Sequence, residues 1–207
     1  MASILDLLNT DKGSEFISKA MDKTGESKDN ITSALGLALP ILLGAIKKNI
    51  QDKKGARELN SALNDNKHGQ EFLDTLKDKN PSAMTSEGSR ILQHILGSNQ
   101  ENINKTLSTT LGIKESSISD ILKMAAPLLM SVLASQKKQE KVKTSGLDDL
   151  IESVMGSSGK FDSSLISAFL DKNKDGSIID DVSGMIFGGN KAKKGNGGIL
   201  GGMLGGK

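Results

Sequence analysis

Two apolar stretches with a proline in the middle dominate the pattern of hydrophobic and polar positions. The first runs Ile31–Ile46 and the second Ile118–Leu133. Their composition predicts two long buried helices. Proline removes one backbone hydrogen bond, and its ring clashes with the carbonyl one turn earlier. We therefore expect a kink or a break before Pro40, near residues 36–39, and a matching one before Pro127.

The segments around these two helices are similar to each other. Each is predicted to form a helix, a glycine stop, a polar turn and an apolar helix that ends in lysines. The identical pairs are Gly25/Gly112, Ile31/Ile118, Leu35/Leu122, Ala38/Ala125, Pro40/Pro127 and Leu42/Leu129. We interpret the similarity as an internal duplication, with repeats at about 14–52 and 101–139. It predicts an all-α domain over residues 1–142, with the two proline-kinked helices packed together at its centre.

Shorter amphipathic segments are expected to surround this pair. Helical spacing of apolar residues predicts helices at about 3–8, 14–23, 56–63, 70–76 and 85–96. Ser14 and Ser27 are suitable N-caps, and Pro81 is predicted to separate two helices. His68 falls in a turn and His94 on an exposed helix side, and neither has neighbours that would make it a catalytic base or a metal ligand.

The segment 145–188 is predicted to form a helix–loop–helix unit preceded by one more helix. The helices are expected at about 146–155, 161–170 and 179–187, and the polar loop lies between the last two. The loop between the last two begins with Asp171, Asn173 and Asp175, followed by Gly176. Oxygen ligands at alternate positions before a glycine form the opening half of a calcium loop. The predicted metal ligands are Asp171, Asn173, Asp175, Ser177 through its carbonyl, Asp180 and Asp181.

This loop departs from the usual calcium loop at its last position, which is Val182 instead of a bidentate glutamate. The loop would close early on Asp180 or Asp181, so we expect weak binding, with a dissociation constant on the order of 10⁻⁴–10⁻³ M. A loop with many oxygens favours Ca²⁺, with Mg²⁺ as the alternative. A solvated turn with a Ser177–Asp180 capping box is the other interpretation. That alternative leaves the three alternating oxygens before a glycine unexplained.

Composition narrows the function further. The chain has no cysteine, five Phe and neither Trp nor Tyr, and its net charge is +2. These counts exclude thiolate chemistry, argue against base stacking on aromatic platforms and imply no nucleic-acid partner. The N-terminus lacks the pattern of a signal peptide. The longest apolar run, residues 34–46, is shorter than the ~20 residues that span a bilayer. The sequence therefore predicts no transmembrane segment and a cytoplasmic location.

The last segment, 189–207, has eight glycines and is predicted to be a flexible tail. Its apolar residues between paired glycines favour an alternative, in which the tail mediates self-association or contact with a membrane surface.

The chain resembles a bacterial family known only as domain of unknown function 937, which includes YidB-like proteins. The resemblance rests on Leu39-Pro40-Ile41, on Ala126-Pro127-Leu128, on the segment Gly88–Gly97 and on the Asp171 loop that ends in Asp180-Asp181. The family has no assigned activity, so the resemblance supports the fold and leaves the function open.

The favoured hypothesis for function is a non-enzymatic structural or protein-interaction module with a weak calcium site. It would act on an unknown protein partner or through self-association. Peripheral membrane association is the alternative. An enzyme is disfavoured, because the sequence offers no nucleophile–base pair, phosphate loop or convergent carboxylates.

Overall fold

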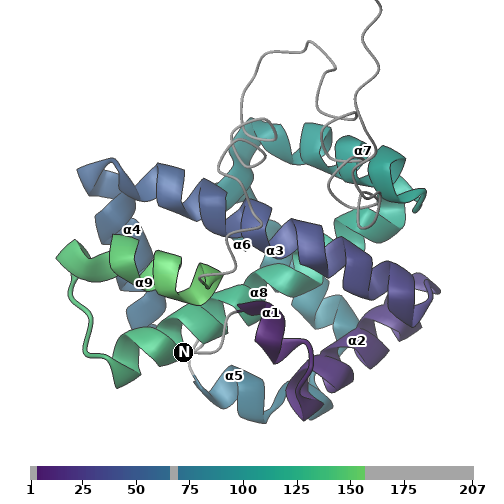
Figure 1. The fold of residues 1–207 in the computed structure, drawn as a ribbon, viewed down its shortest axis with the longest axis horizontal. Coiled ribbons are helices and arrows are strands. Elements are labelled where there is room, and N and C mark those ends of the chain that lie inside the picture. Colours follow the sequence, from purple (N-terminus) through teal and green to yellow (C-terminus); the bar gives the residue numbers. More distant parts are fainter. Residues whose placement is uncertain (1–3, 66–69, 157–207) are drawn as a thin grey trace, which may run out of the picture.

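A computed structural model describes residues 4–65 and 70–156 of the chain (Figure 1). This part is helical and contains no β-strand, so the predicted all-α class is confirmed. The α-helices are α1 Ile4–Leu7, α2 Asp11–Thr24, α3 Lys28–Ile50, α4 Lys53–Asn64, α5 Gln70–Asp74, α6 Pro81–Leu96, α7 Gln100–Leu111, α8 Glu115–Gln139 and α9 Leu147–Met155. Single turns of 3₁₀ helix lie at η2 Leu76–Asp78, η3 Gly97–Asn99 and η4 Thr144–Gly146.

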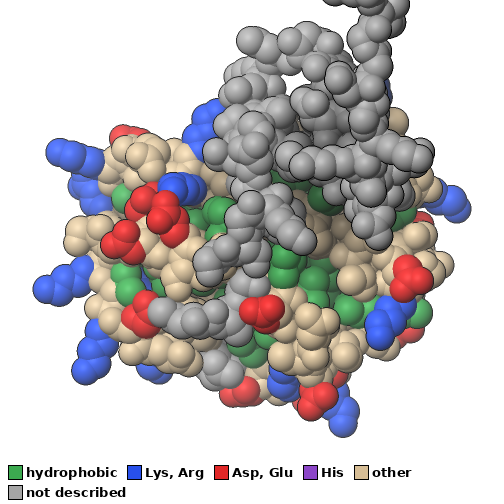
Figure 2. All heavy atoms as spheres, viewed as in Figure 1, with side chains coloured by type: hydrophobic (Ala, Val, Ile, Leu, Met, Phe, Trp, Pro, Cys, Tyr) green, Lys and Arg blue, Asp and Glu red, His purple; other side chains and the backbone are tan. Residues whose placement is uncertain are grey.

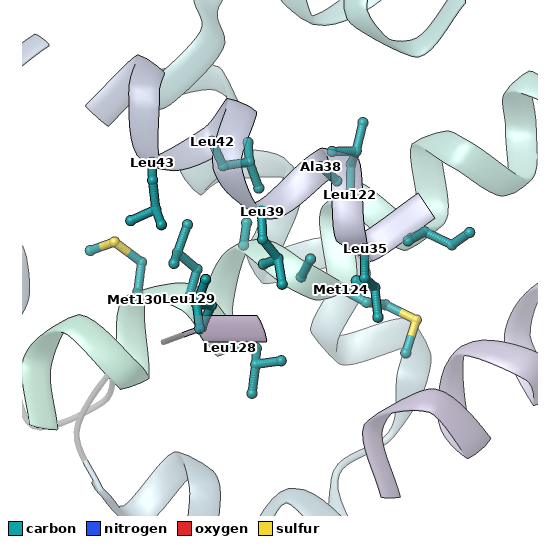
Figure 3. Packing of buried hydrophobic residues seen from close by; sticks show 14 of the residues in the cluster. Leu35, Ala38, Leu39, Leu42, Leu43, Leu122, Met124, Leu128, Leu129 and Met130 are labelled. Carbon is teal, nitrogen blue, oxygen red and sulfur yellow. The ribbon is translucent and has the colours of Figure 1, made fainter. Parts of the chain in front are cut away.

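The two apolar helices of the sequence are α3 and α8, and they lie against each other at the centre (Figures 1 and 3). Leu35, Leu39 and Leu42 of α3 are fully buried, as are Leu122 and Leu129 of α8. Helix α8 also contacts α2, α4, α5, α6, α7 and α9. It is therefore the element around which the other helices are assembled.

Both central helices are long and apolar enough to cross a membrane, which corrects the expectation that these stretches are too short. In α3, however, 67% of the apolar window is buried inside the protein, and in α8 the figure is 83%. Burial of this extent is typical of core helices in a soluble domain. The length arises because polar residues at both ends of each apolar stretch join the helix.

Neither central helix breaks at its proline. Pro40 lies 12 positions after Lys28, the first residue of α3, and Pro127 lies 12 positions after Glu115, the first residue of α8. The helices that precede them both end at a left-handed glycine, Gly25 with φ 72° and Gly112 with φ 66°. These matching positions agree with the repeat seen in the sequence, whose origin by duplication stays a hypothesis.

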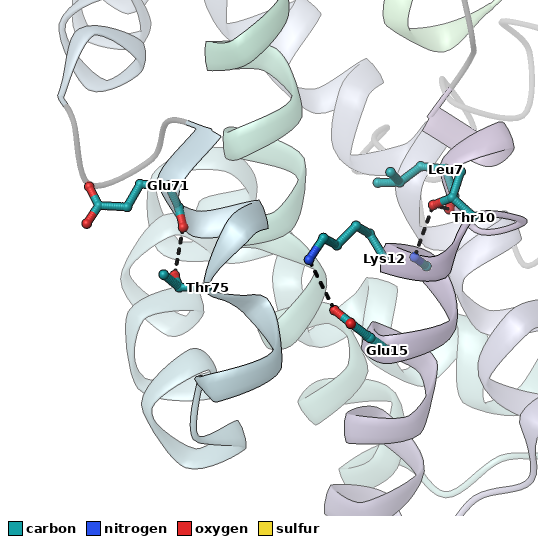
Figure 4. Close-up of polar contacts among 7 residues, drawn as sticks. Leu7, Thr10, Lys12, Glu15, Glu71 and Thr75 are labelled. Carbon is teal, nitrogen blue, oxygen red and sulfur yellow. Dashed lines mark hydrogen bonds and ion pairs between the residues drawn. The ribbon is translucent and has the colours of Figure 1, made fainter.

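The sequence was a poor guide to two helix starts. Helix α2 begins at Asp11 and not at Ser14, because the hydroxyl of Thr10 accepts a hydrogen bond from Gly13 N at 3.3 Å and caps it. The same hydroxyl donates to the carbonyl of Leu7 at 2.7 Å, which ties α1 to α2 (Figure 4). Helix α6 begins at Pro81 itself, since proline fits the first helical turn.

Helix α6 packs on α8 at Gly88, in the most extensive helix–helix contact of the described residues. A Cβ atom at Gly88 would overlap the carbonyl oxygen of Lys123. That oxygen lies four residues before Pro127, which has no N–H to bond to it. The α-hydrogen in the Cβ direction of Gly88 points at this carbonyl, in the manner of the Cα–H···O contacts found where helices approach closely.

Helix α9 belongs to the same core, although the sequence places it in the C-terminal segment. Its Leu147, Leu150, Ile151 and Val154 are at most 1% exposed, and it contacts α1, α3 and α8. The hydrogen bond to Glu152 and the nearby Asp148 carboxylate raise the pKa of Lys47 in α3. Because the pKa of Lys47 is raised in the folded protein, its pairing with Glu152 contributes to stability at neutral pH. This contribution is lost only as the pH rises through the raised pKa.

The close approach at Gly88 gives a stability prediction. The Gly88→Ala variant should be destabilised by about 3 kcal/mol, because its methyl group meets backbone and not a movable side chain. The adjacent exposed position provides a control, Ser89→Ala, which should change stability by less than about 0.5 kcal/mol. Chemical denaturation of both variants at equal concentration measures this difference. Equal stability of the two variants would show that α6 does not pack as described.

Candidate interaction groove

An open groove with a volume of about 1530 Å³ lies between the end of α3, α4, α5 and α6. Three buried residues, Ile46, Phe72 and Met130, form part of its lining. Above them, Ile50, Leu59, Ala62, Ile91 and Ile95 are only half-buried and pack against the core from the groove side. The groove therefore combines an apolar floor with partly solvated apolar walls.

Helix α6 supplies one wall of the groove through the face that is not packed on α8. The residues that line the groove recur at helical spacing: Ala83, Ser86, Glu87, Arg90, Ile91, His94 and Ile95. The opposite face of α6, including Gly88, Leu92 and Leu96, is buried against the core. In the helix predicted at about 85–96, the apolar residues Ile91 and Ile95 stand next to Leu92 and Leu96 in the sequence, and the spacing favours burial of all four. The structure leaves the first pair half-open, so this unusually wide apolar stripe was the signal for a second contact surface.

The corner between α3 and α4 fixes a second wall. Asn49 Nδ2 donates to the carbonyls of His94 at 3.3 Å and Ile95 at 3.0 Å, which ties the end of α3 to the end of α6. Asp52 caps α4 by accepting from the backbone N–H groups of Lys54 and Gly55. A Cβ at Gly55 would overlap the carbonyl oxygen of Asn49, so a glycine is required for α4 to turn back so tightly.

The far end of α4 is held by a buried lysine. Lys137 of α8 is 8% exposed, and its Nζ donates to Asn64 Oδ1 at 2.5 Å. Helix α8 continues through Lys137 to Gln139, so this residue belongs to the helix that the sequence predicted to end in lysines. Apart from Leu63, the residues of α4 are half-buried or exposed, so this hydrogen bond is a main constraint on its position.

The third side of the groove is α5 with η2. Phe72 is 1% exposed, and the ammonium of Lys79 lies 4.7 Å from the centre of its ring. Thr75 Oγ1 donates to the carbonyl of Glu71 at 2.7 Å within this short helix (Figure 4). Lys19 of α2 donates to the carbonyl of Lys79 at 2.8 Å and connects this wall to the rest of the domain.

Charges of both signs surround the groove. The acidic residues are Asp52, Glu58, Asp65, Glu71 and Glu87, and the basic ones are Lys48, Lys54, Lys79 and Arg90. His94 lies among them and is exposed, as the sequence predicted. A mixed rim of this kind does not create the one-signed field that steers a polyanion.

The residues predicted to bind a metal, Asp171 to Asp181, lie outside the described part of the chain, and so does His68. The helices predicted at 161–170 and 179–187 and the tail 189–207 lie outside it too. Within residues 4–65 and 70–156, no three His, Cys, Asp or Glu side chains come together as a metal site would require.

The described residues thus define an all-helical domain built on two central proline-containing helices, with an open groove on its surface. The family comparison agrees with this class. The model of the family described as "Bacterial protein of unknown function (DUF937)" matches residues 6–136 and 139–207, and the chain belongs to this family. Neither a curated protein nor a solved structure gives a significant match.

The Lys137–Asn64 hydrogen bond can be tested by a double-mutant cycle. Asn64→Ala should destabilise the protein by about 2 kcal/mol, because it leaves a buried ammonium group without its acceptor. Adding Lys137→Met removes that charge, so the double variant should lose at least about 1 kcal/mol less than the sum of the single losses. The control Lys138→Ala removes an exposed neighbour and should have little effect. Additive losses in denaturant unfolding would mean that the two groups do not interact.

Proposed function

We propose that the protein is a non-enzymatic interaction module, and that its groove binds an amphipathic helix of a partner protein. The observation that carries this proposal is the row of half-buried apolar residues along the groove, Ile50, Leu59, Ala62, Ile91 and Ile95. Apolar side chains that stay partly solvated along an open groove commonly mark a binding site.

The size of the groove favours a helix over a small molecule. Its volume of about 1530 Å³ exceeds the ~300–1,000 Å³ of ordinary small-molecule pockets. The same volume corresponds to a helix about 10 Å wide and about 20 Å long. The groove-lining residues Ile91 and Ile95 of α6 lie four residues apart, which suits the anchor side chains that a partner helix presents at positions i and i+4.

The rim charges define the partner's polar face. Because residues of both charges line the groove, a helix with both kinds of charge flanking its apolar stripe fits best. Binding of nucleic acid is not part of this proposal, since that would need a basic surface. The groove also offers no nucleophile–base pair among its lining residues, which supports a binding role over catalysis.

A pull-down with matched variants tests this proposal. The immobilised full-length chain should retain a partner that the Ile91→Asp/Ile95→Asp variant binds at least tenfold more weakly, since two central anchors are lost. Lys105→Glu, an exposed substitution on α7, should bind like the wild type. Circular dichroism checks that each variant is folded. A partner retained equally by all three proteins would contradict a role for the groove.

The second part of the proposal is the weak Ca²⁺ site at Asp171, Asn173, Asp175, Ser177, Asp180 and Asp181, with Mg²⁺ as the alternative ion. It rests on the spacing of oxygen ligands before Gly176 in the sequence. Millimolar Ca²⁺ should raise the thermal midpoint relative to excess chelator, because an ion that binds only the folded state stabilises it. The Asp175→Ala variant should lose this shift. An unchanged midpoint for both proteins would refute the site.

We further propose that the protein is soluble and cytoplasmic. The burial of α3 and α8 inside the domain supports a soluble protein, since their apolar faces are already covered by protein. Association with a membrane surface through the tail 189–207 is the alternative, and equal flotation with liposomes of the chains with and without the tail would remove it.

A further inference from the structure

The described chain ends beside a face of α3 that no described element covers. Helix α9 lies along α3 in the antiparallel direction: Gln51 Nε2 donates to Asp148 Oδ1 at 3.4 Å, and one turn further along α9 Glu152 pairs with Lys47, one turn earlier in α3. The same side of α3 continues from Lys47 through Pro40 to Gly36, Ser33 and Asp29. Helix α9 ends at Met155, so it covers only the C-terminal half of this side.

From Asp29 to Leu37 this side is open and partly apolar, whereas Pro40 is buried. Ser33 and Asp29 are exposed, and Leu37 beside them is half-buried. A Cβ built at Gly36 would have no atom within 4 Å, so there is room for another element to approach closely. Helices α1 and α7 also contact α3. Figure 2 shows hydrophobic side chains gathered in the middle of this face, over α3 next to α1 and α9.

The chain that follows supplies a segment that fits this face. Gly156 ends α9 with φ 79° and is followed by the residues Ser157, Ser158, Gly159 and Lys160. The next ten residues carry apolar side chains at Phe161, Leu165, Ile166 and Phe169, a spacing that predicts one apolar stripe on a helix. Ten helical residues extend about 15 Å, and α3 between Lys28 and Pro40 extends about 18 Å.

We propose that residues 161–170 form a helix that packs, apolar side inward, on the Asp29–Pro40 half of α3, in the same antiparallel direction as α9. The open side of α3 is thus covered by this chain's own C-terminal segment. A linker of four residues reaches at most ~14 Å, which keeps the segment close to the end of α9. The surface is separate from the partner groove, so this inference stands whether or not the groove binds a helix.

Because the chain has no cysteine, pairs of introduced cysteines test this arrangement in the full-length protein. In the antiparallel register Ala168 comes next to Ser33. Under mild oxidation, Ser33→Cys/Ala168→Cys should form an intramolecular disulfide at least fivefold faster than two controls. The first control, Ser33→Cys/Ser163→Cys, uses the polar side of the same segment. The second, Ser86→Cys/Ala168→Cys, uses the partner groove on α6.

The proposal would be overturned if the test pair formed its disulfide less than fivefold faster than either control, or if the Ser86→Cys/Ala168→Cys pair reacted faster. A disulfide-linked dimer as the main product would overturn it too.

A second measurement does not depend on disulfide geometry. The thiol of the single variant Ser33→Cys should react with a soluble thiol reagent at least fivefold faster when Leu165→Asp is added, since the covering helix is then released. Adding Ser163→Asp instead should leave the rate unchanged, and equal rates in the two backgrounds would contradict docking through the apolar stripe.

Discussion

Pro127 removes the helical donor of one carbonyl oxygen in α8, that of Lys123, and the packing of the molecule follows from how this oxygen is covered. A proline inside a helix costs about 3 kcal/mol, so surrounding contacts must offset it. Here Gly88 brings the backbone of α6 onto the free carbonyl, and Leu128 and Leu129 beside the proline are fully buried. With α6 fixed on α8 in this way, its other face is turned toward α3 and α4, where it forms a wall of the groove. The glycine and the proline therefore determine the core and the surface together.

Much of this fold can be predicted from the sequence. The apolar runs gave the two central helices, and Ser27 and Gly25 gave the start of α3 and the end of α2. Local rules failed where two of them compete. Pro81 signals a break, but it also suits a first helical turn, and Asn80 before it provides the cap. Pro40 and Pro127 signal breaks too, and the helices continue because tertiary burial outweighs one lost hydrogen bond. The burial of Lys137 could not be predicted, because its charge favours solvent and its acceptor, Asn64, lies far away in the chain.

The groove was harder to predict than the core, because it depends on contacts between residues far apart in the chain. Nothing local shows that Asn49 will bond to the end of α6 or that Gly55 must pass over Asn49. Only the apolar stripe of α6, wider than one interface needs, pointed to it. The calcium-type loop has the opposite character. Its signal is entirely local, in the spacing of Asp171, Asn173 and Asp175, and it lies outside the described residues, so it stays a prediction.

The central proposal is that α3 and α8, which are largely buried, are the core of a soluble domain and do not span a membrane. Hydrogen exchange of the purified full-length chain in detergent-free buffer tests it most directly. We expect the amides of Leu35–Leu43 and Leu122–Leu129 to exchange slowest of all, by global unfolding only, while amides of α4 exchange faster through local opening. A chain that stays in solution only with detergent, or central helices that exchange as fast as α4, would contradict it.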